Sequence, residues 1–437
     1  MLNKLKFKKL SFFKSRKDLA AIIVNTGWLF ADRILRMGGS LIVGVWVARY
    51  LGVHNYGLFN YSSAFVALFS PIASLGLDRL VVRSVVNDLS AKDNILGTTF
   101  WLKLIGAFLS SLLAIGLALL LNENQPQAFW LVVIFSSASM FQAFDTIDIW
   151  FQSQVQSKYT VIGKNTAFFL TILLRITLVI TKSPLLSFAW ASFAESAIGA
   201  LGLVVLYNFK HHSLHSWRWK FAVAKSLLRE SWPLIFSGLS IVVYMKIDQV
   251  MLGQMVGQEA VGVYSAAARM SEVWYFIPTT IVSSSAPAIY AAKKAANENL
   301  YYGRIKKLLR LLTLTSISIA IPMTFLSGKI ITVLFGNSYT EAGTILSIHI
   351  WASLFVFLGV ASGPWFLAEG LSHLSMYRTL AGAITNIVLN IILIPRYSGV
   401  GAAIATVISY AVGSCLLNAT HPKTKKFFLL QVKSLFL

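Results

Sequence analysis

Apolar runs of roughly 20 residues, separated by short polar connectors, follow one another along almost the whole chain of 437 residues. Such a run spans the hydrocarbon core of a bilayer as a helix, and lipid leaves no partners for the backbone of an open strand. The pattern therefore predicts an all-α integral membrane protein. With breaks at Gly, Pro and charged residues, about twelve spans are expected, near 20–50, 57–77, 97–121, 128–150, 161–181, 184–207, 232–253, 262–290, 308–326, 341–367, 377–394 and 397–418.

The composition agrees with a membrane protein and excludes one function class. The chain is 56% hydrophobic and 12% charged, with a net charge of +22. In a soluble protein that charge would suggest a nucleic acid partner. Here the Lys and Arg residues gather in the connectors and tails, where they meet anionic lipid headgroups. We therefore expect the lipid bilayer, and no nucleic acid, as a partner.

The distribution of positive charge predicts the orientation of the spans. With the N-terminus inside, 28 Lys and Arg residues fall in cytoplasmic segments, against four (Arg49, Lys182, Lys329 and Arg396) in the opposite connectors. Both termini are therefore expected in the cytoplasm. The expected organisation is a basic tail (1–19), an N-terminal six-helix bundle (20–207), a basic cytoplasmic linker (208–231), a C-terminal six-helix bundle (232–418) and a basic, apolar tail (419–437).

Two pairs of matching segments favour a sequence repeat between the halves, although Gly and aromatic residues are also common at membrane ends. The segment 51–62 resembles 256–267, with Gly57 and Gly262 at equivalent places. Trp150-Phe151, followed by Ser157, returns as Trp365-Phe366, followed by Ser372. Because six spans bring the chain back to its starting side, the halves should be related by a pseudo-two-fold axis along the membrane normal. Such a pair of bundles would enclose a central cavity.

Ionisable residues within the spans supply the candidate functional groups. A charge at the bilayer centre costs about 2.5–3.5 kcal/mol even on insertion scales, so these groups should face water or one another. Arg suits phosphate because its planar fork donates two hydrogen bonds. The expected substrate-binding cations of a cationic cavity are Arg33, Arg36, Arg175, Lys246, Arg269 and Lys103. The acids expected to couple an ion or to pair in the lumen are Asp32, Asp145, Asp148, Glu195, Asp248 and Glu272.

Two simpler readings stay open for these charges. Acids and bases can pair across helices as buried structural contacts. Lys103, Asp145 and Asp148 lie near span ends and can reach the interface. No Walker loop, Ser-His-Asp arrangement or HExxH stretch is present, and His211, His212 and His215 lack a fourth ligand nearby in sequence. We therefore expect no catalytic residue, no cofactor and no metal.

Short motifs along the whole chain resemble those of the Wzx-type O-antigen or polysaccharide flippases, within the multidrug/oligosaccharidyl-lipid/polysaccharide exporter superfamily. They are Ala48-Arg49-Tyr50-Leu51-Gly52, Tyr56-Gly57, Gly76-Leu77-Asp78-Arg79, Lys246-Ile-Asp248-Gln, Val261-Gly-Val-Tyr264 and the stretch from Asn386 to Pro395. The resemblance implies a bilobed twelve-helix fold in a bacterial inner membrane.

The same resemblance implies a function. An undecaprenyl-diphosphate-linked oligosaccharide would pass from the cytoplasmic to the periplasmic leaflet by alternating access, driven in some members by a cation. A polysaccharide polymerase and a chain-length regulator would be possible partners. The surface polymer could be O-antigen, and so part of lipopolysaccharide biosynthesis.

Other functions remain to be weighed. A multidrug or cation antiporter of the same superfamily would share the fold, but its cavity should be acidic to receive cationic drugs. A membrane glycosyltransferase or polymerase usually needs a large external loop, and the expected external connectors are short. Sugar identity leaves no trace in the sequence, because almost any polar side chain can meet a neutral hydroxyl.

Overall fold

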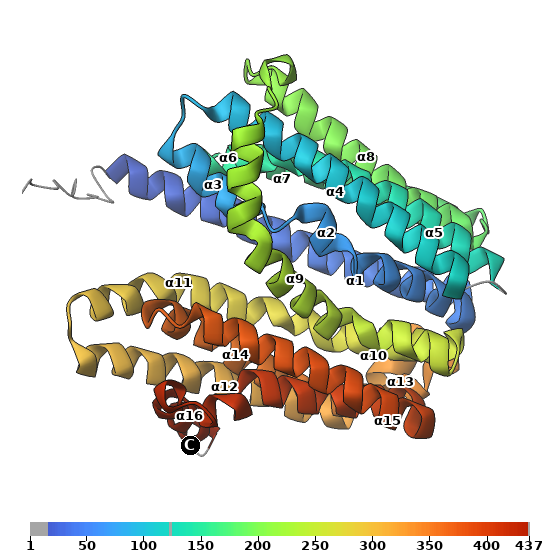
Figure 1. The fold of residues 1–437 in the computed structure, drawn as a ribbon. Coiled ribbons are helices and arrows are strands. Elements are labelled where there is room, and N and C mark those ends of the chain that lie inside the picture. Colours follow the sequence, from blue (N-terminus) through green and yellow to red (C-terminus); the bar gives the residue numbers. More distant parts are fainter. Residues whose placement is uncertain (1–15, 122–124, 436–437) are drawn as a thin grey trace, which may run out of the picture.

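The structure is a computed structural model that describes residues 16–121 and 125–435. Every element in these ranges is a helix. The helices form two bundles, with α9 running obliquely between them (Figure 1). Lys4, Lys6, Lys8, Lys9 and Lys14 of the basic tail lie outside the described residues. The expected all-α architecture is confirmed.

The first bundle is built around the long helix α1, which packs against α5 and α7. Its elements are α1 (Arg16–Ala67), α2 (Ser70–Ser74), α3 (Asp78–Asn87), α4 (Lys92–Leu121), α5 (Pro126–Ser139), the 3-10 helix η1 (Met140–Phe144), α6 (Asp145–Ser153), α7 (Ser157–Ile180) and α8 (Leu185–Phe209). The predicted linker, 208–231, contains the 3-10 helix η2 (Leu214–Ser216) and the start of α9 (Phe221–Met255).

The second bundle follows α9. Its elements are α10 (Gln258–Glu272), η3 (Val273–Tyr275), α11 (Phe276–Lys294), α12 (Glu298–Phe335), η4 (Asn337–Tyr339), α13 (Glu341–His349), α14 (Ala352–Ala368), α15 (Ser372–Ser414), η5 (Leu416–Ala419) and α16 (Pro422–Leu435). In this bundle α15 packs against α9, α13 and α14, while α12 packs against α13, α14 and α16.

Nine helical stretches within the described residues are long and apolar enough to cross a membrane. Two of them contain a backbone break, because α1 turns at Gly52 (φ 72°) and α15 turns at Ser398 (φ 48°). These turns lie close to the breaks predicted after residues 50 and 394. The chain is a multi-pass membrane protein, and the number of twelve spans stays a prediction.

The two copies of the sequence repeat touch each other. A methyl group on Gly57 would lie 1.7 Å from the carbonyl oxygen of Gln258, and one on Gly262 would lie 2.1 Å from that of Val53. Gln258 occupies the place in the second copy that Val53 occupies in the first. The contact is therefore reciprocal, as an approximate two-fold axis requires, and only glycine allows the backbones to approach this closely.

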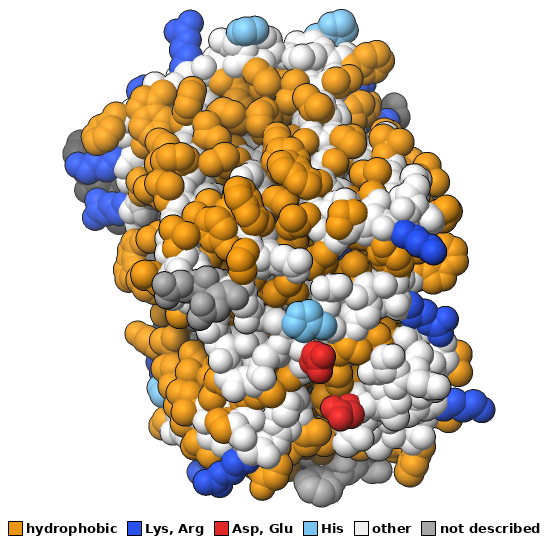
Figure 2. Space-filling model, turned by 90° about the vertical axis from the view of Figure 1, so that its right-hand side faces the viewer, with side chains coloured by type: hydrophobic (Ala, Val, Ile, Leu, Met, Phe, Trp, Pro, Cys, Tyr) orange, Lys and Arg blue, Asp and Glu red, His pale blue; other side chains and the backbone are white. Residues whose placement is uncertain are grey.

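The bundles meet more closely at one end than at the other. Residues of α1 from Phe30 to Leu35 are mostly exposed, whereas Val43, Ala48 and Leu51 are buried. At the end of the molecule where Ala48 and Leu51 lie, the Tyr339 hydroxyl donates to the Ala48 carbonyl at 2.8 Å, and Gln258 donates to Gln125 at 3.0 Å. Figure 2 views the molecule from this side and shows acidic side chains beside a histidine near the middle of the face, amid hydrophobic and uncharged groups, with Lys and Arg toward the edges.

Candidate substrate cavity

The first bundle contains a cavity of about 450 Å³, bounded by α1, α2, α4, α5, η1, α7 and α8, and closed on one side by Arg269 of α10. Its polar lining consists mainly of hydroxyl and amide side chains. They are Asn60, Ser63, Ser70, Ser110, Ser139, Gln142, Ser192 and Ser196. Aromatic rings of Tyr56, Phe59, Phe135 and Phe188 complete the wall. A volume of this size can hold a small organic group.

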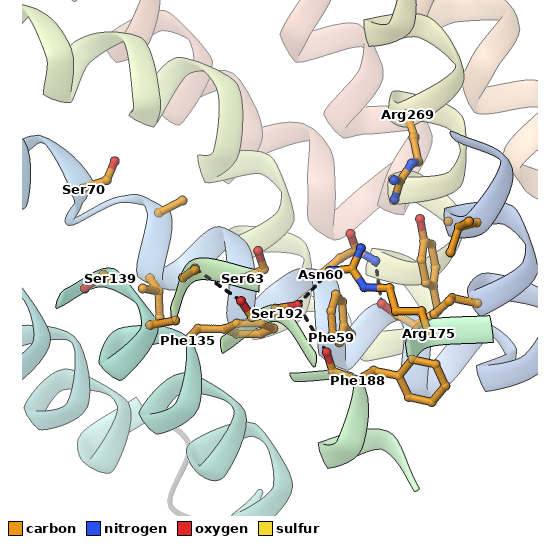
Figure 3. Close-up of a pocket in the computed structure, with 18 of the residues that line it drawn as sticks. Phe59, Asn60, Ser63, Ser70, Phe135, Ser139, Arg175, Phe188, Ser192 and Arg269 are labelled. Atoms are coloured by element: carbon orange, nitrogen blue, oxygen red, sulfur yellow. Dashed lines mark hydrogen bonds between the residues drawn. The ribbon is translucent and has the colours of Figure 1, made fainter. Parts of the chain in front are cut away.

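Arg175 enters the cavity from α7. Its Nη2 donates to the Ser192 hydroxyl at 3.1 Å and lies 3.2 Å from a carboxylate oxygen of Glu195, one turn further along α8. Arg175 and Arg269 both point toward the same space in Figure 3. Glu195 does not line this cavity. Arg175 is therefore held by one face of α8 while it remains accessible from the cavity.

Arg269 reaches across from the second bundle. Its Nη2 donates to the Ser40 carbonyl at 2.7 Å, on α1. Gly44 makes room for it, because a methyl group there would lie 2.5 Å from Cζ of Arg269. A carbonyl stabilises the guanidinium without neutralising it. Among the described residues, the lining of the cavity therefore carries two cations and no acidic side chain.

A second cavity of about 330 Å³ adjoins the first, with Gln142, Ser192 and Ser196 in both walls. Its charged lining is Arg36, Asp145, Lys164 and Glu195. The two cavities thus share one polar wall in the first bundle, and their charged lining is four cations against two acids.

Most charges around the second cavity are already paired. Arg36 donates to Asp32 at 2.9 Å and lies 5.2 Å from the centroid of Phe168. Lys164 lies 2.8 Å from Asp145 and 3.2 Å from Asp148. Asp145 and Asp148 share a face of α6 and therefore meet the same ammonium group.

The acid Asp248 has a different environment, inside the second bundle. It is 3% exposed and accepts hydrogen bonds from Tyr264 (2.7 Å), Asn390 (2.6 Å) and Thr406 (2.6 Å). No cationic nitrogen lies within 4.0 Å of it among the described residues. Its carboxylate is thus surrounded by neutral donors.

The structure does not bring every candidate to the cavities. Arg33 is exposed on α1 and lines neither of them. Lys103 is 2% exposed and pairs with Asp78 at the start of α3. Lys246 of α9 faces Glu272 of α10 at 3.9 Å.

Sequence reasoning missed two kinds of residue. The hydroxyl and amide lining carries no recognisable motif, since Ser and Asn are common in spans. Lys164 and Arg378 are among the 28 Lys and Arg residues that the sequence analysis counted as cytoplasmic, yet Lys164 lines the second cavity and Arg378 is buried in α15. Lys164 is the eighth residue of Ser157–Ile180 and Arg378 is the seventh of Ser372–Ser414, a depth that could have signalled a position inside the bundle.

Solved structures of other proteins share this fold. A multidrug resistance MATE family transporter of the MOP superfamily, in an inward-facing conformation, has a TM-score of 0.75 at 14% identity, covering 92% of this chain and 94% of that chain. The lipid II flippase MurJ, inward closed, has a TM-score of 0.71 at 16% identity, covering 95% and 91%. The fold is therefore the one that these membrane transporters share.

The family follows from the sequence comparison. The family described as "Polysaccharide biosynthesis protein" matches residues 22–293, and the MatE family matches residues 233–392. The chain belongs to the polysaccharide biosynthesis protein family.

Curated relatives match over a shorter stretch. The probable flippase AglR of Haloferax volcanii is 33% identical over 189 residues, which is 41% of this chain and 38% of AglR. The probable low-salt glycan biosynthesis flippase Agl15 of the same organism is 26% identical over 200 residues, 45% and 42% of the two chains. The capsular polysaccharide biosynthesis protein CapF of Staphylococcus aureus is 24% identical over 220 residues, 50% and 54%. The matched stretch is thus about half or less of each relative's length.

Proposed function

We propose that this protein is a flippase, and not an enzyme, which moves a lipid-linked oligosaccharide across the membrane by alternating access. The observation that carries the proposal is the pair Arg175 and Arg269 on one cavity whose lining holds no acid. The family, and relatives described as flippases or as capsular polysaccharide biosynthesis proteins, point the same way.

The two arginines suit a diphosphate. Arg175 comes from the first bundle and Arg269 from the second, so one anionic group between them would bind both bundles at once. Arg36 and Lys164 extend the cationic lining into the second cavity, where Asp32, Asp145 and Asp148 compensate them. Neither cavity is lined by Lys246, Lys103 or Arg33, so these cations would act on the bound substrate less directly.

The remaining lining suits a sugar. Serine hydroxyls and the amides of Asn60 and Gln142 can exchange hydrogen bonds with sugar hydroxyls, while the rings of Phe59, Phe135 and Phe188 offer flat apolar faces. None of these groups demands one particular sugar, so the same wall would accept repeat units of varied composition.

The direction of transport rests on topology. We place the protein in a bacterial inner membrane with both termini in the cytoplasm. On that orientation, 28 Lys and Arg residues fall in cytoplasmic segments and four in the opposite connectors. The substrate would be an undecaprenyl-diphosphate-linked oligosaccharide for O-antigen or another surface polymer. It would move outward, toward a polymerase and a chain-length regulator acting in the same process.

A coupling ion would bind at Asp248. Its carboxylate has three neutral donors, and Oδ1 of the neighbouring Asn390 is buried without a partner. A cation could replace the missing positive charge by taking oxygen ligands from both side chains. Glu195 is less suited to this role, because Arg175 already pairs with it.

A multidrug antiporter is the second candidate, since a MATE transporter shares the fold. A cavity for cationic drugs should be acidic, whereas the first cavity has two arginines and the two cavities together have four cations against two acids. Electrostatics therefore favours an anionic substrate.

The proposal is tested with the purified protein in proteoliposomes that carry a defined undecaprenyl-diphosphate-linked oligosaccharide. Arg175→Ala and Arg269→Ala should each lower the flipping rate by about tenfold or more, since each removes a charge-assisted phosphate contact. Arg269→Lys should keep part of the rate, because it keeps the charge but not the fork.

Arg229→Ala is the matched control, since Arg229 is exposed on α9 outside both cavities. Equal rates for the control and both cavity variants, at equal amounts of inserted protein, would refute the proposal. Export of a cationic dye without movement of the lipid would favour the multidrug function.

A further inference from the structure

A separate cavity of about 230 Å³ lies on the second bundle, where α14 ends, α15 begins and the chain enters α16. Arg378 of α15 and Phe366 of α14 line it on one side. Asn418, Thr420 and His421 line it on the other. None of its lining residues belongs to the cavities of the first bundle.

Arg378 is a buried cation without an acidic partner. The residue is 9% exposed, and no carboxylate oxygen lies within 4.0 Å of its guanidinium in the described parts of the chain. Nη2 donates to the Ser362 hydroxyl, Nη1 lies 3.5 Å from the Ser414 carbonyl, and Nε has no partner. Cζ lies 4.3 Å from the centroid of Phe366. Neutral contacts alone leave a buried charge poorly compensated, so an anion would complete the site.

The rest of the lining would accept an anion. Its lining, drawn from the described residues, contains no Asp or Glu and includes Tyr377, whose hydroxyl can donate to an anion. The hydroxyls of Thr420 and Thr424 and the Asn418 amide already donate to other groups of the protein. The wall formed by α16 is fixed, because Phe427 stacks on Trp365 with ring centroids 4.6 Å apart. Gln431 also accepts a hydrogen bond from Asn418 at 2.8 Å. The cavity is therefore part of the packed bundle and not a gap beneath a loose tail.

An apolar stripe leads away from the cavity along α15. Leu380, Ile384, Val388 and Ile391 are each between 42% and 55% exposed and recur at intervals of three or four residues, so they share one face of the helix. The stripe continues the exposed face of Tyr377, which lines the cavity and lies one turn before Leu380. A molecule with an anionic head at Arg378 could lay its hydrocarbon chain along this stripe.

We propose that this cavity binds the phosphate of an anionic membrane phospholipid, with the acyl chain on the α15 stripe. The predicted cytoplasmic position of Arg378 agrees with such a lipid, because anionic headgroups at that surface attract clustered Lys and Arg. Lys423, Lys425 and Lys426 of α16 are exposed beside the cavity and add to that attraction. The site holds a structural or regulatory lipid and is distinct from the transport cavity.

The test measures lipid binding to the purified full chain in detergent, by native mass spectrometry and by thermal stabilisation. The probes are phosphatidylglycerol, phosphatidylcholine and inorganic phosphate. Phosphatidylglycerol should bind more tightly than phosphatidylcholine, and inorganic phosphate should not stabilise the protein at the same concentration. Arg378→Ala should weaken phosphatidylglycerol binding about tenfold.

Two further variants keep the test decisive. Ala381→Phe fills the cavity without removing the arginine, so it should weaken binding to a similar extent even if Arg378→Ala proves unstable. Lys329→Ala removes an exposed charge of α12 predicted on the opposite side, and it should bind phosphatidylglycerol like the parent. Unchanged binding in Ala381→Phe, or inorganic phosphate binding as tightly as the lipid, would overturn the proposal.

Discussion

The charges around the cavities of the first bundle and the two most deeply buried charges of the second bundle have different partners. In the first bundle Arg36, Lys164 and Arg175 each face a carboxylate within 3.2 Å. In the second, Asp248 and Arg378 are nearly fully buried and have neutral partners only within 4.0 Å, among the described residues. The backbone contact between the two repeats is nevertheless reciprocal.

The two bundles thus share a backbone contact, but the partners of their charged residues differ. A charge with a fixed opposite partner needs no ligand to be compensated. Exchanging the two charged residues can preserve such an ion pair. A charge among neutral donors is compensated only when an ion or a proton binds. We therefore expect Asp248 and Arg378 of the second bundle to respond to small ions and lipid, and the cavity that Arg175 and Arg269 line to respond to substrate. The following predictions test this division, in order of decreasing effect.

The largest effect is expected from Asp248→Asn. The amide has nearly the shape of the carboxylate but no charge, so the position among Tyr264, Asn390 and Thr406 would no longer attract a cation. Transport driven by a sodium or proton gradient should fall at least about tenfold and lose its dependence on the gradient, with the protein still folded. The assay is flipping in proteoliposomes with and without each gradient. Glu341→Gln, on α13, is the control.

A variant that kept both the rate and the gradient response would remove Asp248 from coupling. A variant that lost the rate but kept the gradient response would assign Asp248 to substrate handling and not to the ion.

The next prediction concerns the backbone contact between the two repeats. Gly57→Ala and Gly262→Ala should lower stability by similar amounts, about 1–3 kcal/mol each, because each added methyl meets a backbone carbonyl across the repeat contact. Both should also slow transport, since the contact closes one end of the molecule. Thermal unfolding of the purified proteins measures the first effect. Gly116→Ala and Gly363→Ala, whose added methyl groups would meet no atom within 4 Å, should be close to neutral. Clearly unequal losses at Gly57 and Gly262 would argue against the two-fold relation.

A smaller effect on stability, but an informative one, is expected from the Arg175→Glu, Glu195→Arg exchange. Either single change puts two like charges 3.2 Å apart and should lower the amount of inserted protein severalfold. The double variant should recover insertion, because the pair is restored in reverse. It should not recover flipping, because the cation has moved from the cavity to the α8 face. Recovery of both would mean that Arg175 serves packing alone.

Much of the fold could be predicted from the sequence, for a definite reason. The length of the apolar runs sets the length of the helices. The matching glycines Gly57 and Gly262 indicated two related halves, and the structure brings these glycines into contact with the opposite half. The breaks near Gly52 and Ser398 also lie where Gly or Pro interrupts an apolar run. Each of these features depends on local sequence.

The site was less predictable because a membrane helix has apolar residues on all sides, so periodicity does not mark the face that meets another helix. Arg33 and Arg36 were both expected to line a cavity, yet Arg33 is exposed and Arg36 lines one. Only the packing of α1 against α7 decides that difference. The placement of Arg175 and Arg269 on one cavity follows the expectation, and their role as ligands stays a prediction.

The smallest effect is expected at Lys103, which the structure places away from both transport cavities. Its ammonium is buried, while its partner Asp78 is 61% exposed. Asp78→Asn should therefore cost only about 1–3 kcal/mol of stability, because the amide oxygen can still accept a hydrogen bond from Lys103. Lys103→Met should be tolerated similarly, since it removes the buried charge and keeps most of the volume. Both variants should flip substrate at close to the parent rate, as measured by initial rates at equal amounts of inserted protein. A tenfold loss of flipping in Lys103→Met with unchanged stability would instead return Lys103 to the substrate-binding cations, and would show that an ion pair in the first bundle can open to take part in transport.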